Sequence, residues 1–120
     1  MASILIVDDS PTMRNLVKRL LEAHGHDVSE AGDGSSGLLS VVEKAPDLVV
    51  SDINMPQMDG FQMIGSVRSS KSKSELPIVV LTTETSNSSK EKLRDLGANA
   101  WVAKPFDDDV FIKVINQHLS

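Results

Sequence analysis

Five polar side chains with reactive groups follow four short apolar runs that lie far apart in the sequence. Asp8 and Asp9 follow residues 4–7, Asp52 follows residues 48–51, Thr82 follows residues 78–81 and Lys104 follows residues 100–103. Carboxylates are the oxygen ligands that a hard divalent cation prefers, and an ammonium attracts a phosphoryl group. If the fold gathers these five residues, we expect a site for Mg²⁺ and for phosphoryl transfer.

The charges of this set predict that the metal is required. Three ionised carboxylates carry −3 and the Lys104 ammonium returns +1, which leaves −2. Like charges about 4 Å apart repel by up to roughly 4 kcal/mol per pair at an effective dielectric constant of 20. One Mg²⁺ ion would bring the sum to zero.

The apolar runs are typical of parallel strands that are buried on both faces, and helical stretches separate them. The pattern predicts strands at about residues 4–7, 27–31, 47–52, 78–82 and 99–103. In an open parallel sheet, ligands bind beyond the carboxyl ends of the strands, and all five polar residues lie at such ends.

Amphipathic stretches after each strand predict five helices. Ser10 and Pro11 should begin the first, Asp59 should cap the third, and Ser88–Glu91 matches a capping box for the fourth. The residues expected to face the core are Met13, Leu16, Val17, Leu20 and Leu21 in the first helix, Leu38, Leu39, Val41 and Val42 in the second, and Val110, Phe111, Val114, Ile115 and Leu119 in the last. Arg14, Lys18 and Arg19 are expected to form a solvated face. The result is an α/β fold, a doubly wound (βα)5 three-layer sandwich.

Composition limits the classes of partner. A length of 120 residues predicts one domain, and a net charge of −5 argues against nucleic-acid binding. No apolar stretch approaches the roughly 18 residues of a membrane span. The first residues lead straight into a strand and leave no room for a secretory signal, so we expect a cytoplasmic protein without a membrane partner.

The motifs around these residues resemble those of the receiver domains of two-component response regulators. The resemblance is carried by the Asp8–Asp9 pair, the segment Asp52–Gly60, Thr82 and Lys104–Phe106, and it covers essentially the whole chain. It implies a single receiver domain over residues 1–120 with a flavodoxin-like strand order, 2-1-3-4-5. The narrower resemblance is to the single-domain receivers of chemotaxis, which signal by direct binding.

The resemblance also implies a role for each site residue. Asp52 would be the phosphoacceptor, Asp8 and Asp9 would be metal-site acids, and Thr82 and Lys104 would contact the phosphoryl group. A cis peptide bond between Lys104 and Pro105 would aim the ammonium into the site.

Mg²⁺ prefers six oxygen ligands and retains waters. We expect Asp9 and Asp52 as direct ligands, Asp8 through a bound water, and the backbone carbonyl of Asn54. Asn54 and Glu84 lie two residues beyond Asp52 and Thr82, so both should border the path of the water that hydrolyses the acyl phosphate. The resemblance implies that residues at such positions tune the lifetime of the phosphorylated state.

A switch is expected through Thr82 and Trp101. A phosphoryl oxygen would draw the Thr82 hydroxyl inward and vacate space into which the Trp101 ring could turn. The family usually has tyrosine or phenylalanine at this position. The alternative is that Trp101 serves packing alone. The output surface would combine the helix after Thr82, the strand at residues 99–103 and the last helix.

The expected partners are a histidine kinase as phosphodonor, a target such as a flagellar motor switch component, and a phosphatase. We expect a monomer that catalyses only its own phosphorylation and dephosphorylation, so it would not be an enzyme. Two alternatives stay open: a phosphorelay intermediate that passes its phosphoryl group to a histidine phosphotransfer protein, and a phosphatase of the haloacid dehalogenase type. The latter needs a general acid where this chain has Asn54. A flavodoxin is disfavoured because no phosphate-binding loop opens the first helix.

Overall fold

Strands and helices alternate along the whole of the described chain. The computed structural model describes residues 2–70 and 73–119. Its elements in chain order are β1 (Ser3–Val7), α1 (Pro11–Ala23), β2 (Asp27–Ala31), α2 (Gly34–Lys44), β3 (Leu48–Ser51), α3 (Gly60–Ser69), β4 (Ile78–Thr82), α4 (Asn87–Leu96), β5 (Ala100–Ala103) and α5 (Asp108–Gln117). Within these residues no helix is both long enough and apolar enough to cross a membrane.

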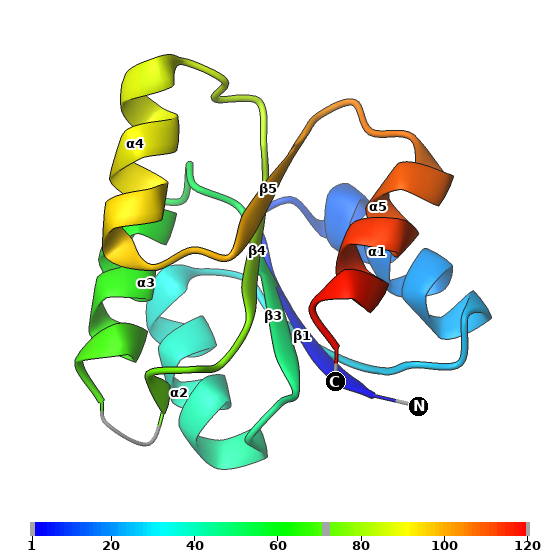
Figure 1. Ribbon diagram of the computed structural model, residues 1–120. Helices are drawn as coiled ribbons and strands as arrows, with labels where there is room; N and C mark the ends of the chain where they lie inside the picture. Colours follow the sequence, from blue (N-terminus) through cyan, green and yellow to red (C-terminus); the bar gives the residue numbers. More distant parts are fainter. Residues whose placement is uncertain (1, 71–72, 120) are drawn as a thin grey trace.

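The strands form one parallel sheet in the order β2-β1-β3-β4-β5. Helices α1 and α5 lie on one face of the sheet, and α2, α3 and α4 lie on the other (Figure 1). The predicted three-layer sandwich and its strand order are therefore confirmed. The order reverses between β1 and β3, which places a crevice at the carboxyl ends of these two strands.

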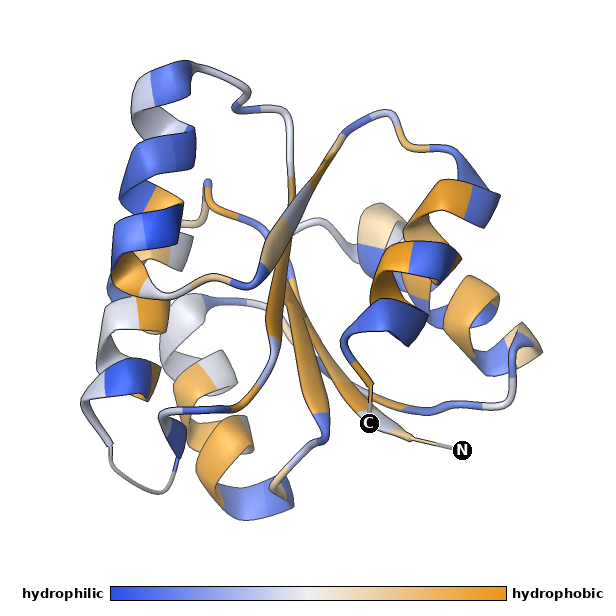
Figure 2. Cartoon of the chain, in the orientation of Figure 1, coloured by the Kyte–Doolittle hydropathy of each residue, from blue (hydrophilic) through white to orange (hydrophobic). Residues whose placement is uncertain are grey.

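The core divides into two clusters, one on each face of the sheet. Val49 belongs to the cluster under α2, α3 and α4, whereas its neighbour Val50 belongs to the cluster that contains Phe111 of α5. Successive strand residues point to opposite faces, so a central strand with both faces covered must be apolar throughout. The central strands β1, β3 and β4 accordingly form the hydrophobic centre of the molecule (Figure 2).

Four residues that were expected to face the core are exposed instead. Leu16, Leu39, Val42 and Val110 are 51%, 59%, 67% and 53% exposed, while their neighbours Val17, Val41 and Phe111 are buried. Adjacent helix residues point about 100° apart. In α1 and α2 one residue of an adjacent apolar pair therefore turns away from the sheet, whereas the pair Met63–Ile64 of α3 is buried at both positions.

The beginning of α4 also differs from the prediction. The capping box expected at Ser88–Glu91 is wrong, because the helix begins at Asn87 and its N-cap is Ser86. The Ser86 hydroxyl accepts a hydrogen bond from the Ser89 backbone N–H at 3.2 Å. Several serines in this segment could serve as caps, and Ser86 precedes the first helical residue with an extended backbone.

The other end of α4 is fastened to its neighbours by Arg68 of α3. The Arg68 Nε and Nη2 atoms donate to the Gly97 carbonyl at 3.1 and 2.9 Å, and Nη2 also donates to Asn99 Oδ1 at 2.9 Å. Asn99 Oδ1 in turn accepts from the Ile78 backbone N–H. These bonds join α3, the end of α4 and the start of β4, and we call them the Arg68 clamp.

Candidate functional site

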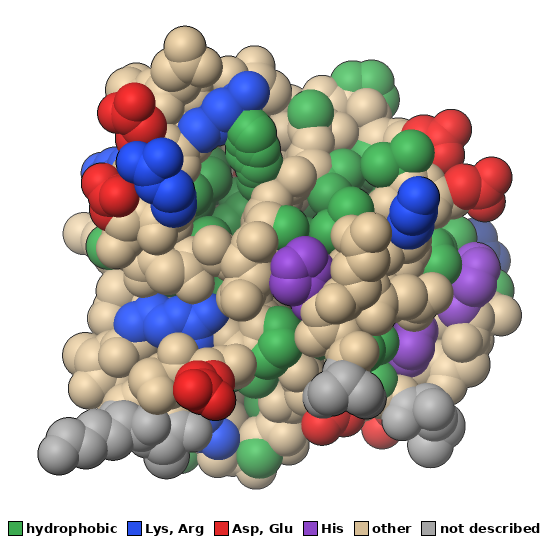
Figure 3. Space-filling view, in the orientation of Figure 1, with side chains coloured by type: hydrophobic (Ala, Val, Ile, Leu, Met, Phe, Trp, Pro, Cys, Tyr) green, Lys and Arg blue, Asp and Glu red, His purple; other side chains and the backbone are tan. Residues whose placement is uncertain are grey.

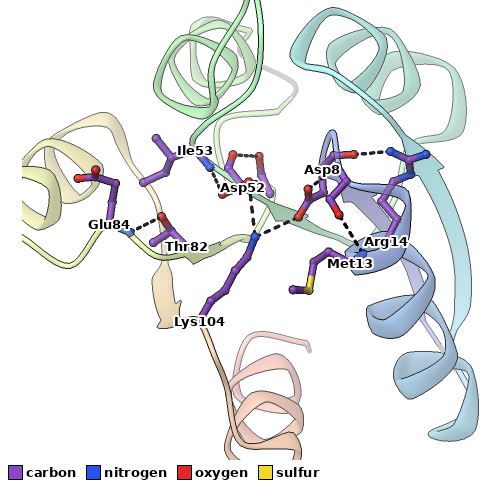
Figure 4. Close-up of polar contacts among 10 residues, drawn as sticks. Asp8, Met13, Arg14, Asp52, Ile53, Thr82, Glu84 and Lys104 are labelled. Carbon is purple, nitrogen blue, oxygen red and sulfur yellow. Dashed lines mark hydrogen bonds and ion pairs between the residues drawn. The ribbon is translucent and has the colours of Figure 1, made fainter.

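The predicted site residues come together at the carboxyl edge of the sheet. The parallel register pairs Val7 with Ser51, and Thr82 with Ala103, so the residues that follow these strands lie at one level. The Lys104 ammonium extends across this edge to two carboxylates, at 3.2 Å from Asp8 Oδ2 and 3.5 Å from Asp52 Oδ2 (Figure 4). The Lys104–Pro105 peptide bond is cis, as the resemblance implied.

Three carboxylates form a compact cluster at this edge. One oxygen from each of Asp8, Asp9 and Asp52 can be chosen so that all three lie within 4.8 Å of one another. Asp8 and Asp52 are buried, and Asp9 is exposed. This clustering concentrates negative charge at a point where solvent reaches only one member.

The three carboxylates differ in their protein partners. Asp8 accepts hydrogen bonds from the Ser10 backbone N–H at 2.9 Å and from Lys104, and Asp52 Oδ1 accepts one from the Ile53 backbone N–H at 2.7 Å. No donor to the Asp9 carboxylate occurs among residues 2–70 and 73–119. Asp9 is therefore the carboxylate most available to an added ligand.

Burial raises the pKa of the Asp52 carboxyl above its ordinary value. The attraction of Lys104 and the hydrogen bond from the Ile53 N–H act in the opposite direction, and the charge of Asp8 adds to the rise. A raised pKa is the direction expected where Lys104 and the Ile53 N–H offset only part of the cost of burying the Asp52 charge. A bound cation would compensate it.

The donor set fits Mg²⁺. The ion is hard, takes carboxylate and carbonyl oxygens, and usually uses one or two protein carboxylates while keeping waters. The structure offers an uncommitted carboxylate on Asp9, a second on Asp52, and the loop carbonyl of Asn54 nearby in sequence. The Asn54 side chain is exposed, so it faces solvent rather than the core.

Thr82 and Trp101 both line a small cavity. The cavity has a volume of about 80 Å³ and is lined by Thr82, Glu84, Thr85, Lys90, Trp101 and Ala103. The Thr82 hydroxyl accepts a hydrogen bond from the Glu84 backbone N–H at 2.9 Å. The Glu84 carboxylate accepts one from the Ser89 hydroxyl at 3.2 Å, which links this loop to α4.

The Trp101 ring is half-buried beneath a lysine of α4. The Lys90 ammonium lies 4.2 Å from the centroid of the ring. This distance is within the range of a cation–π interaction. The indole therefore contacts both the cavity beside Thr82 and the outer face of α4.

Two residues that support the site were not identified from the sequence. Arg14 was expected on a solvated face, but its Nη1 donates to the Asp8 carbonyl at 2.6 Å. Gly60 packs so closely that a Cβ atom there would overlap the Asp52 carbonyl oxygen. A signal for Gly60 was available, since a glycine at a helix start after a functional loop indicates a close backbone approach.

The chain is similar to known signalling proteins along its whole length. It matches the response regulator receiver domain family over residues 4–116. It is 37% identical to Protein PilH of Pseudomonas aeruginosa over 120 residues, which cover 100% of this chain and 99% of PilH. It is 42% identical over 118 residues to Sensor protein EvgS of Escherichia coli, covering 98% of this chain and 9% of EvgS.

A solved structure of a chemotaxis protein also resembles this chain in sequence and in fold. The Vibrio cholerae chemotaxis protein CheY4 superposes with a TM-score of 0.94 at 37% identity, covering 99% of each chain. The narrower resemblance to the single-domain chemotaxis protein CheY is thereby confirmed. Together with the acid cluster at the sheet edge, these matches show that the chain belongs to the response regulator receiver domain family.

Proposed function

We propose that this protein is a phosphorylation-activated signalling switch of the chemotaxis type, in which Asp52 accepts a phosphoryl group from a histidine kinase. The observation that carries the proposal is the position of Lys104, whose ammonium lies within 3.5 Å of Asp52 and 3.2 Å of Asp8. This arrangement puts a positive group beside a buried carboxylate that has a raised pKa. It suits a nucleophile that must meet a negatively charged phosphoryl group.

The metal site would use the residues of the acid cluster. Asp9 and Asp52 would bind Mg²⁺ directly, Asp8 would act through a bound water, and Asn54 would contribute its backbone carbonyl. Bound Mg²⁺ would supply the positive charge that offsets the cluster and the equatorial phosphoryl oxygens. Asp8 suits an indirect role, because its two oxygens already accept bonds from Ser10 and Lys104.

The reaction would be an in-line displacement at phosphorus. A carboxylate oxygen of Asp52 forms a bond to phosphorus while the bond to the kinase imidazole breaks, and Lys104 and the Thr82 hydroxyl contact the phosphoryl oxygens. Such transfers depend on positioning and charge neutralisation more than on covalent help. Water then attacks phosphorus, which restores the Asp52 carboxylate and releases inorganic phosphate. Asn54 and Glu84 border the path of that water and tune the lifetime.

The output surface would be the face formed by α4, β5 and α5. A groove of about 380 Å³ lies there, with Trp101 of β5 and Leu93, Lys90 and Arg94 of α4 among its lining residues. In Figure 3, hydrophobic side chains are exposed between α4 and α5, and Lys or Arg side chains lie over α4. When Thr82 turns toward the phosphoryl group, Trp101 would move toward the cavity beside it and reshape the groove.

A target protein such as a flagellar motor switch component would read this surface. Similarity to a chemotaxis protein over 99% of both chains supports this role. A phosphorelay intermediate remains the second candidate, because the 42% identity to EvgS is to a protein named as a sensor. We expect a cytoplasmic monomer with no nucleic-acid or membrane partner, and a phosphatase that ends the signal.

Incubation with acetyl phosphate and Mg²⁺ tests the acceptor. Intact-protein mass spectrometry should detect one added phosphoryl group on the wild type and none on Asp52→Asn. Asp95→Asn, in an exposed ion pair on α4, is the matched control and should behave as the wild type. Modification that persists in Asp52→Asn would move the acceptor to another residue.

A further inference from the structure

Arg14 reaches from α1 back to the acid cluster. Its Nη1 atom donates to the Asp8 backbone carbonyl at 2.6 Å (Figure 4). Its Nε atom lies 3.4 Å from Glu30 Oε1 near the end of β2. The Arg14 side chain is only 20% exposed, so the guanidinium is held at the surface rather than free in solvent. None of the steps proposed above uses it.

The hydrogen bond to Asp8 bears directly on Asp9. The Asp8 carbonyl and the Asp9 amide nitrogen belong to one planar peptide unit. A hydrogen bond to the Asp8 carbonyl therefore restrains the orientation of this peptide unit, and with it the direction in which the Asp9 side chain leaves the backbone. Since no described residue donates to the Asp9 carboxylate, the backbone is what holds this side chain near Asp52.

Glu30 orients the guanidinium that makes this bond. It pairs with Arg14 and also with Lys18, whose Nζ lies 3.4 Å from Glu30 Oε2. Lys18 thus carries the same charge as Arg14 and pairs with the same acid, Glu30, but it is not hydrogen-bonded to Asp8. The chain therefore contains its own control for the charge of Arg14.

We propose, on the basis of the function proposed above, that Arg14 is a positioning residue for the Mg²⁺ site. By holding the Asp8–Asp9 peptide, it keeps the Asp9 carboxylate where it can bind the ion together with Asp52. A positive charge alone would have the opposite effect, because it disfavours a nearby cation. The direction in which Mg²⁺ affinity changes on removal of Arg14 separates the two roles.

Calorimetric titration of Mg²⁺ into three proteins tests this. Arg14→Met keeps an apolar stem of similar reach and removes the bond to Asp8, and it should weaken Mg²⁺ binding about tenfold, as loss of a group that orients a metal ligand does. Lys18→Met removes an equal charge and the other Glu30 ion pair, and its affinity should equal or slightly exceed that of the wild type.

The rate of phosphorylation by acetyl phosphate provides a second measurement. For Arg14→Met it should be low at limiting Mg²⁺ and return to within about twofold of the wild type at saturating Mg²⁺, because the defect is in binding the ion. Glu30→Gln keeps Arg14 but weakens its orientation, and should reduce Mg²⁺ affinity by a smaller factor of about threefold. If Arg14→Met does not fold, Arg14→Leu, which removes the same charge and the same bond to Asp8 with a shorter apolar side chain, takes its place beside Lys18→Met.

Unchanged or tighter Mg²⁺ binding by Arg14→Met would overturn the proposal, as would equal weakening in Lys18→Met. Equal affinities of Glu30→Gln and the wild type would also count against it. These outcomes leave the proposed function intact as long as the wild type binds Mg²⁺ and Asp52 is modified. Absence of Mg²⁺ binding by the wild type would overturn both.

Discussion

The chemistry of single residues at this site depends on a charge excess that the protein leaves uncompensated. Lys104 lies near two carboxylates, and Asp9 adds a third. Burial is the main factor that disfavours the ionised form of Asp52, and the charge of Asp8 adds to it. The site is thus arranged for a cation and a phosphoryl group at some cost to the stability of the metal-free protein.

Asp52→Asn should therefore stabilise the metal-free protein. The folded-state pKa of Asp52 is raised above 3.8, so the folded protein holds this proton more tightly than the unfolded chain does. Stability from this group is highest below the unfolded value and is lost as the pH rises through the raised pKa. Asparagine resembles the neutral carboxyl, and we expect a gain of about 1 kcal/mol in the free energy of unfolding at pH 7.

Urea unfolding in the presence of EDTA measures this gain. The difference between Asp52→Asn and the wild type should shrink as the pH falls through the raised pKa and below 3.8, where the carboxyl becomes neutral in both states. Asp95→Asn, at an exposed position on α4, should leave the free energy of unfolding at pH 7 within about 0.5 kcal/mol of the wild type. A variant less stable than the wild type at pH 7 would contradict the charge argument.

The sequence predicts the site residues better than it predicts their supports. Asp8, Asp52, Thr82 and Lys104 follow strands, and the carboxyl ends of parallel strands must meet at one edge. Arg14 lies on a helix, and its spacing says only which side of that helix it occupies. The conformation of its long side chain is decided by Glu30 and the Asp8 carbonyl, which are tertiary partners.

At the scale of elements, the start of α3 is fixed against the strand that carries Asp52. Gly60 N–H donates to the Ile53 carbonyl at 2.8 Å, and its Cα leaves no room for a side chain. Gly60→Ala should therefore destabilise the protein by more than about 2 kcal/mol, since backbone would have to move. It should also slow phosphorylation, because Asp52 would shift with it.

Gly65→Ala is the matched control within the same helix. A Cβ atom at Gly65 would meet only Leu96 Cδ2 at 3.7 Å, an ordinary contact. Alanine in a helix interior is favoured over glycine by roughly 0.5–1 kcal/mol, so this variant should be more stable. Thermal unfolding of both variants gives the comparison. Similar effects of the two substitutions would contradict the close packing at Gly60.

Two lysines of α4 allow the position of Trp101 to be tested. Lys90 lies over Trp101 at 4.2 Å, and Lys92 lies over Phe61 at 4.1 Å. Lys90→Met removes an attraction worth about 0.5–1 kcal/mol at an exposed site, so the emission of Trp101 should change and the ring should turn inward more readily. Lys92→Met should leave the emission unchanged. Emission spectra of the unphosphorylated wild type, Lys90→Met and Lys92→Met make the comparison. Identical spectra for the three proteins would exclude a role for Lys90 in positioning Trp101.

The helix faces were predicted less well than the helices. Pairs such as Leu16–Val17 and Val41–Val42 are apolar at both positions, and nothing in the local pattern says which residue points inward. The choice depends on the rotation of the helix against the sheet, and that rotation follows from the packing of the whole layer. The central strands β1, β3 and β4 had no such ambiguity, because both of their faces are covered.

At the scale of the whole molecule, binding of Mg²⁺ should stabilise the fold. An ion that binds only the folded state at 100 times its Kd adds about 2.7 kcal/mol, which corresponds to a rise of roughly 10 °C in Tm for a domain of this size. Scanning calorimetry with and without Mg²⁺ measures the rise. Asp9→Asn should lose most of it, and an undiminished rise in that variant would place the ion elsewhere.

The Arg68 clamp has a mechanical consequence. Because Arg68 holds the end of α4 at Gly97 and, through Asn99, the start of β4, any tilt of α4 would pivot about its last turn. The ten residues of α4 span about 15 Å. A tilt of about 10° would therefore displace the start of the helix at Asn87 by roughly 2.5 Å and hardly move its end at Gly97. A protein that binds α4 near Asn87 would distinguish a tilted from an untilted helix. A protein that binds near Gly97 would bind both with equal affinity.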